Sequence, residues 1–128
     1  RDSSTSRGLG DVYKRQPFEP SSLAQVAGLA ALDDNDFLIS SIELNKRGME
    51  YIKKELELLG VDYIPSVTNF ITTLWESETK ATLLSKNLLE KGIIVRQLTA
   101  FGWPACIRIS IGLEKENERF IESLKQII

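Results

Sequence analysis

The spacing of apolar residues changes at Gly60, and this change limits the folds open to the chain. Before Gly60, alternating steps of four and three residues place one stripe along a helix: Leu38, Ile42, Asn45, Met49, Ile52, Leu56 and Leu59, of which only Asn45 is polar. After Gly60, β-branched and aromatic residues gather in short runs, which is typical of strands. Gly60 itself is the expected helix stop. The sequence therefore predicts a long helix followed by a small domain that contains a sheet.

The region after Gly60 has alternating strand and helix signals. The expected order begins with a strand entry over 61–64 and a strand over 67–75, separated by Pro65-Ser66. A helix ending at 91–92, a strand over 93–98, a loop over 99–105, a strand through 107–111 and a helix over 114–128 follow. This β-α-β-β-α order predicts an α/β fold, a small sheet covered by helices on one side. Upstream, Ser22 and Gln25 have capping-box spacing for a helix over 23–32 that is rich in alanine and glycine.

The first sixteen residues are polar and show no apolar period. Residues 11–16 can be back-translated into a sequence that resembles the transposon-end adapter used in sequencing libraries. We expect residues 1–16 to be a non-native, adapter-derived or disordered tail; a natural flexible terminus is the alternative. Residues 17–60 then form a helical arm, and residues 61–128 form the small domain.

Composition excludes several kinds of function. The chain has 128 residues, 42% of them hydrophobic and 27% charged, which predicts one soluble, cytoplasmic globular protein. Its apolar runs fall short of the roughly 20 residues needed to cross a bilayer, so no membrane role is expected. A net charge of −2 without a basic cluster argues against nucleic acid as a partner. With no histidine and Cys106 alone, the chain has no Ser-His or Cys-His apparatus, internal disulfide or multi-cysteine metal site.

Two arginines are the leading candidates for binding. Arg96 closes the apolar run that begins at Gly92, and Arg108 alternates with Ile107 and Ile109 in a strand-like run. An arginine in such surroundings needs an anionic partner, and its planar fork fits a carboxylate or phosphate. The period of two turns Arg108 away from the isoleucine face. The pair predicts an anion site; pairing with local acids is the alternative.

Several blocks in one collinear order carry a family resemblance. They are Pro17-Phe18, Ser21–Gln25, Ala30–Asp34, Ile64–Ser66, Asn69-Phe70, Gly92–Arg96, Ile107–Gly112 and Glu116-Asn117. Together they resemble the C-terminal part of histidinol-phosphate aminotransferase, and the resemblance covers essentially residues 17–128. It implies the small C-terminal domain of the aspartate aminotransferase fold, preceded by an arm that links it to a large domain.

The resemblance also implies a function. Members of this family use pyridoxal phosphate to transfer an amino group between L-histidinol phosphate and 2-oxoglutarate in histidine biosynthesis, and they are expected to be homodimers when full length. Their Schiff-base lysine and main cofactor contacts lie upstream of the Pro17-Phe18 block. Lys86 follows Ser85 as in a cofactor motif, but its place on an amphipathic helix predicts a solvated lysine. This chain alone is therefore expected to be inactive, with no catalytic, cofactor-binding or metal-binding residue of its own.

Three substrate-binding residues follow from the resemblance. Arg108 matches the arginine that receives the carboxylate of glutamate or the phosphate of histidinol phosphate, and Arg96 matches a second arginine of that pocket. Asn69 is a further candidate, with a hydrogen-bonding role in a turn or at a strand edge as its alternative. Phe101 and Trp103 lie between the arginines, where an imidazole could stack, with plain packing as the alternative.

Two other functions remain open at the level of sequence. A β-α-β-β-α unit without a Schiff-base lysine also suits a stand-alone regulatory module that binds a small effector. Another class I/II aminotransferase is possible too, because a carboxylate-binding arginine is widely shared. An in-frame cofactor-lysine motif upstream of this segment would separate the enzyme from the module.

Deleting residues 1–16 is expected to leave the melting temperature nearly unchanged, because this segment has no apolar period with which to join a core. Thermal melts of the 1–128 and 17–128 chains test this prediction. A fall of several degrees on deletion would show that the segment packs against the domain.

Overall fold

The computed structural model describes residues 20–128 and divides the chain into two compact units between Leu38 and Ile39. The described part of the first unit holds helix α2 (Ser22–Leu32) and the start of helix α3 (Asn35–Leu58). The cap of α2 is Ser21 rather than the expected Ser22: Ser21 has an extended backbone, and its hydroxyl accepts a hydrogen bond from the Ala24 amide. The expected tail at 1–16 lies outside the described residues.

Helix α2 buries none of its residues. Its apolar side chains and its small-residue face are all exposed, so burial of apolar surface does not stabilise this helix within its own unit. Its N-terminus is closed by Ser21 and by the Gln25 side-chain amide, which donates to the Pro20 carbonyl. Among the described residues, the interactions outside the helix backbone that stabilise α2 are therefore these local capping hydrogen bonds.

The apolar stripe predicted for α3 is buried over only part of its length. Met49, Ile52 and Leu56 enter the core, whereas Leu38 and Ile42 are 55% and 58% exposed. The stripe's polar member, Asn45, donates its side-chain amide to the Thr68 carbonyl. The helix ends before Gly60, which has the positive φ of 66° expected of a glycine stop.

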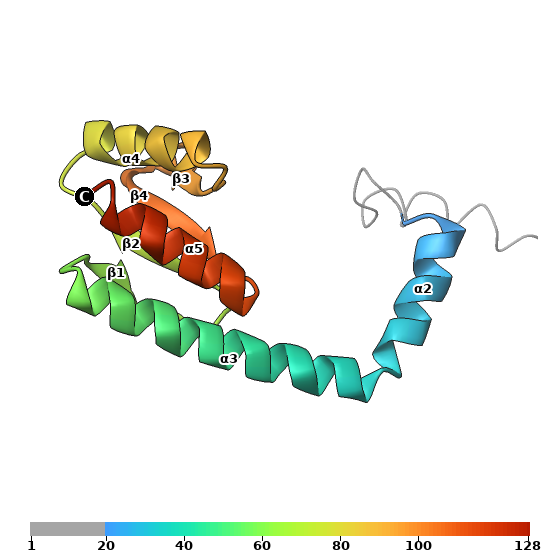
Figure 1. Ribbon diagram of the computed structural model, residues 1–128. Helices are drawn as coiled ribbons and strands as arrows, with labels where there is room; N and C mark the ends of the chain where they lie inside the picture. Colours follow the sequence, from blue (N-terminus) through green and yellow to red (C-terminus); the bar gives the residue numbers. More distant parts are fainter. Residues whose placement is uncertain (1–19) are drawn as a thin grey trace, which may run out of the picture. The chain divides into compact units, whose positions relative to one another are not determined.

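The second unit contains a four-stranded antiparallel sheet in the order β1-β2-β4-β3. The elements are β1 (Tyr63–Ile64), β2 (Phe70–Leu74), α4 (Glu78–Glu90), β3 (Arg96–Leu98), a 3-10 turn η1 (Thr99–Phe101), β4 (Trp103–Ser110) and α5 (Glu114–Lys125). From β2 onward the predicted β-α-β-β-α order is confirmed (Figure 1). The run expected as a strand approach and a strand is two paired strands, because Pro65 interrupts it.

Several predicted boundaries were wrong. Residues 93–95 are not part of β3, which begins only at Arg96, and Ile94 is 87% exposed. The expected loop over 99–105 is shorter, because η1 turns the chain at Gly102 (φ 79°) and β4 begins at Trp103. At the other end β4 stops at Ser110, before the Ile111 that was expected to continue it.

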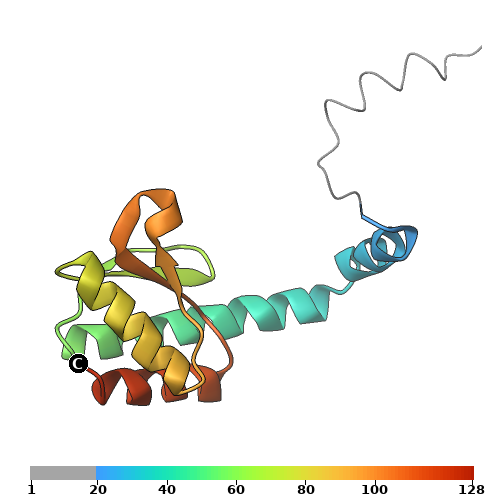
Figure 2. The same ribbon diagram turned by 90° about the horizontal axis from the view of Figure 1, so that it is seen from above.

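The core lies on one face of the sheet. Ile71, Thr73, Ile107 and Ile109 are buried there with residues of the three helices: Met49, Ile52 and Leu56 from α3, Ala81, Leu84 and Leu88 from α4, and Phe120, Ile121 and Leu124 from α5. Buried Thr73 is satisfied, since its hydroxyl donates to the Ile107 carbonyl. In Figure 2 the helices of this unit lie on one side of the sheet, as predicted. The other face of the sheet carries no helix of the described chain.

Helix α3 lies very close to the turn after β4 at Gly48. A Cβ atom there would lie 2.5 Å from Cγ2 of Ile111 and 2.8 Å from Nδ2 of Asn117. The same Asn117 is buried and grips the turn after β4, since its side chain accepts from the Gly112 amide and donates to the Gly112 carbonyl. The glycine is therefore required by packing.

Replacing Gly48 with alanine is expected to lower the free energy of unfolding by about 1–3 kcal/mol, because the methyl group overpacks a filled contact. Urea denaturation measures the change. Gly28→Ala in α2 is the matched control: nothing lies within 4 Å of its Cβ position, and alanine there is expected to be neutral or to stabilise by up to about 1 kcal/mol. Equal effects at the two positions would contradict the packing role of Gly48.

Candidate functional site

Arg96 and Arg108 lie directly opposite each other on the antiparallel strands β3 and β4. Thr72 on β2 is the next partner of Arg108, so the three residues form one row across the sheet. Because Ile107 and Ile109 are buried on the core face, the alternation of β4 places Arg108 on the face without helices. Side chains directly opposite on one face interact, and like charges in this arrangement repel. The row therefore forms a doubly positive site on the open face of the sheet.

The surroundings of the two arginines differ from the expectation of buried charges. Arg96 is exposed and Arg108 is half-buried, so water reduces the cost of their unpaired charge. Neither arginine makes a salt bridge with an acid among residues 20–128. The ion pair within those residues joins Lys125 to Glu55, with 2.6 Å between Nζ and Oε2. The described chain thus gives no support to the alternative in which local acids pair with these arginines.

Each guanidinium instead lies over an aromatic ring. The central guanidinium carbon of Arg108 is 5.2 Å from the ring centroid of Phe70, and that of Arg96 is 5.5 Å from the ring centroid of Phe101. Both distances are within the range of a cation–π interaction. From the sequence, Phe101 was expected either to stack on an imidazole or simply to pack, and no contact was assigned to Phe70.

Asn69 lies immediately before β2, where its backbone carbonyl accepts a hydrogen bond from the Ile111 amide. Its side chain is exposed and makes no hydrogen bond with residues 20–128. The structure therefore brings together two of the three residues proposed from sequence, and it shows a backbone role for the third.

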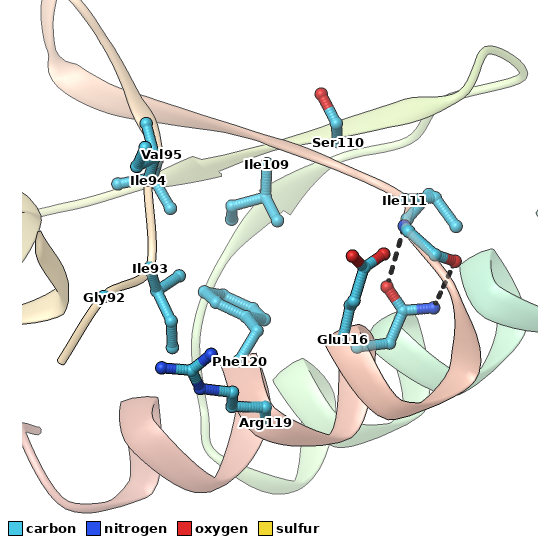
Figure 3. A pocket seen from close by; sticks show the side chains of 12 residues that line it. Gly92, Ile93, Ile94, Val95, Ile109, Ser110, Ile111, Glu116, Arg119 and Phe120 are labelled. Carbon is cyan, nitrogen blue, oxygen red and sulfur yellow. Dashed lines mark hydrogen bonds between the residues drawn. The ribbon is translucent and has the colours of Figure 1, made fainter.

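A cavity of about 320 Å³ lies elsewhere in the unit, between the segment before β3, the end of β4 and α5 (Figure 3). Its polar side chains already hold the fold: Glu116 accepts from the Leu113 amide, and Arg119 donates to the Lys91 carbonyl. None of the three expected site residues lines it. Sequence reasoning missed this cavity because it forms where residues 93–95 separate from β4, and those residues had been expected to form a strand.

The described residues do not fit a Schiff-base site. Every lysine in residues 20–128 is at least partly exposed, and Lys86 is exposed on α4 as predicted. A lysine that forms a Schiff base is normally activated by burial. The same part of the chain has no group of three or more metal-binding side chains, and none of its helices has the length and apolar character needed to cross a membrane.

Comparison with known proteins identifies the class. Residues 7–124 match the family described as aminotransferase class I and II, so the chain belongs to this family. The match begins inside the segment 1–16, whose origin stays a prediction.

The more particular resemblance is to histidinol-phosphate aminotransferases. The chain is 42% identical over 126 residues to the histidinol-phosphate aminotransferase of Methylobacillus flagellatus, covering 97% of this chain and 33% of that protein. It thus spans about a third of the length of the curated relatives it matches. The resemblance predicted from sequence is confirmed at this level.

Solved structures confirm the fold. The histidinol-phosphate aminotransferase of Clostridium acetobutylicum superposes with a TM-score of 0.76 at 25% identity, over 90% of this chain and 35% of that one. A mutant aspartate aminotransferase of Thermus thermophilus superposes with a TM-score of 0.72 at 22% identity, over 95% of this chain and 36% of that one. The chain therefore has the fold of part of an aspartate aminotransferase-type enzyme, as the sequence resemblance implied.

Proposed function

We propose that this chain is the C-terminal part of a histidinol-phosphate aminotransferase and that Arg96 and Arg108 bind the anionic end of its substrates. The complete enzyme then transfers an amino group between L-histidinol phosphate and 2-oxoglutarate in histidine biosynthesis. The observation behind this proposal is a pair of arginines, directly opposite on two strands, with no acidic partner among the described residues. Family membership and the 42% identity to a histidinol-phosphate aminotransferase support the choice of reaction.

The chemistry of the pair suits a doubly charged group. One guanidinium fork binds one carboxylate edge or two phosphate oxygens, whereas a phosphate dianion or a dicarboxylate offers acceptors to two forks. An anion between the arginines also removes the repulsion of two like charges that face each other across the strands. Arg108, half-buried on the inner strand, is the fixed partner, and Arg96 on the edge strand supplies the second fork.

The remaining residues have supporting roles in this proposal. Asn69, immediately before β2, helps to form the wall of the same site. Residues 17–60 are the arm that links a large domain to the small domain of residues 61–128, and the full-length enzyme is a cytoplasmic homodimer. Pyridoxal phosphate supplies the electron-withdrawing ring of the reaction when it is bound. Its lysine and its main contacts belong to the rest of the enzyme, because the described lysines do not fit that role.

A stand-alone module that binds a small effector is the second candidate. The exposure of every described lysine favours it, since such a module needs no Schiff base. The arginine pair serves either function, so a test of the cofactor is needed as well as a test of anion binding. Another class I/II aminotransferase is the alternative within the enzyme class.

The 128-residue chain alone is expected to form no stoichiometric internal aldimine and to show no transamination, because none of its described lysines has a buried site. The test is to mix the chain with pyridoxal phosphate, reduce with borohydride and map adducts by mass spectrometry. Scattered, substoichiometric adducts on surface lysines fit the prediction. A single stoichiometric adduct together with turnover would overturn it.

The role of the arginines is testable in a chimera in which residues 17–128 replace the matching third of the Methylobacillus flagellatus enzyme. Arg108→Ala is expected to lower kcat/KM for both glutamate and histidinol phosphate by about ten- to more than a hundredfold, because each charge-assisted hydrogen bond is worth about 1.5–3 kcal/mol. Arg108→Lys is also expected to lower kcat/KM for both substrates, since the point charge of a lysine does not reproduce the guanidinium fork. Arg96→Ala should be most harmful for the more highly charged substrate.

Lys86→Ala is the matched control, because it removes an exposed cation on α4. Its steady-state kinetics are expected to equal those of the unmodified chimera. If the Arg108 variants also keep the unmodified values, the assignment of the anion site is wrong.

A further inference from the structure

We propose that Phe70 and Phe101 are positioning residues that hold Arg108 and Arg96 with their hydrogen-bonding edges free for an anion. This inference rests on the proposed function of the arginine pair. It adds two residues that do not themselves bind the ligand, and it assigns them an effect on ligand selectivity.

Phe70 reaches Arg108 through the register of the sheet. Phe70 on β2 is opposite Ser110, and Thr72 is opposite Arg108, so Phe70 and Arg108 are diagonal neighbours on one face. Diagonal cross-strand neighbours are within reach of long and aromatic side chains. Both residues are half-buried, and the guanidinium carbon lies over the ring at 5.2 Å from its centroid.

Phe101 reaches Arg96 through the turn that joins the two arginine strands. It is the last residue of η1, and Gly102, with φ of 79°, reverses the chain into β4 immediately afterwards. The strand register also shifts between Gln97 and Leu98, next to this turn. The turn thus brings Phe101 back to Arg96, with 5.5 Å between the ring centroid and the guanidinium carbon, while Phe101 as a whole remains 61% exposed.

An aromatic partner has a different consequence from an acidic one. A carboxylate binds the N–H edge of a guanidinium and occupies the donors that a substrate needs. A phenylalanine ring interacts with the flat face of the guanidinium and leaves the N–H donors free in the plane. It also limits the rotamers of the arginine, which lowers the entropy that binding must remove. The two rings therefore restrain the arginines without competing with the anion.

The two contacts differ in strength of restraint. Phe70 is half-buried in the sheet, so Arg108 is held before any ligand binds, whereas Phe101 is mostly exposed in a turn. Loss of the Phe70 ring is expected to weaken binding of every anion that uses Arg108. Loss of the Phe101 ring is expected to weaken the binding of only those anions that are large or charged enough to need Arg96 as well.

The test uses the 128-residue chain and follows the side-chain Nε–H signals of Arg96 and Arg108 by NMR during titration with inorganic phosphate. Acetate is the singly charged comparison. F70L and F101L remove the ring, F70Y and F101Y keep its charge distribution, and F37L replaces an exposed phenylalanine of α3 that lies under no described arginine.

The ring-removing variants are expected to bind phosphate about two- to fivefold more weakly, the effect of an exposed cation–π contact, with the tyrosine variants and F37L close to the unmodified chain. For acetate, only F70L is expected to weaken binding. The Nε–H groups should also show lower order parameters in the leucine variants, a change that altered packing with fixed arginines would not produce. If F70L does not fold, the F101L and F101Y pair decides by the same phosphate and acetate comparison.

The outcomes separate the inference from the proposed function. If phosphate shifts neither arginine signal in the unmodified chain, the anion site itself is wrong, and the role of the rings is lost with it. If phosphate shifts both signals and F70L and F101L bind it as tightly as the unmodified chain, the anion site stands and the positioning role is overturned. Equal weakening by the leucine and tyrosine variants would also overturn it, because the loss would then not depend on the ring.

Discussion

Burial of Ile107 and Ile109 against the helices determines where the charges of this sheet lie. Successive side chains of a strand point to opposite faces, so these two isoleucines place Arg108 on the open face. A slip of one residue in the pairing of β4 would move Arg108 into the core and the isoleucines into water. The hydrophobic core and the anion site therefore depend on the same register, and a sequence that specifies one also specifies the other.

Much of the fold was predictable because its signals are local. The change of period at Gly60, the stripe of α3 and the alternation around Arg108 each report on one element and its buried face. The errors arose where distant segments decide. Residues 93–95 have strand-forming side chains, yet in the described structure they separate from β4 and form no ladder. Composition alone does not reveal whether a strand-like segment finds a partner.

The same distinction applies to the candidate site. The residue type of Arg96 and Arg108 predicted an anion site, and the alternation of β4 predicted the direction of Arg108. Their direct opposition was not readable from a spacing of twelve residues, because it depends on the turn at Gly102 and on the register shift beside Leu98. The contacts with Phe70 and Phe101 follow from that register, so they became visible only in the folded chain.

The close contact at Gly48 has a mechanical consequence. At Gly48 helix α3 has no side chain of its own and packs directly against the side chains of Ile111 and Asn117, and Asn117 holds the backbone of the turn after β4 through two hydrogen bonds. This contact leaves little room for relative movement, because close-packed groups transmit a displacement rather than absorb it. A tilt of the C-terminal half of α3 is therefore expected to displace the end of β4 and, with it, Arg108, four residues before Gly112.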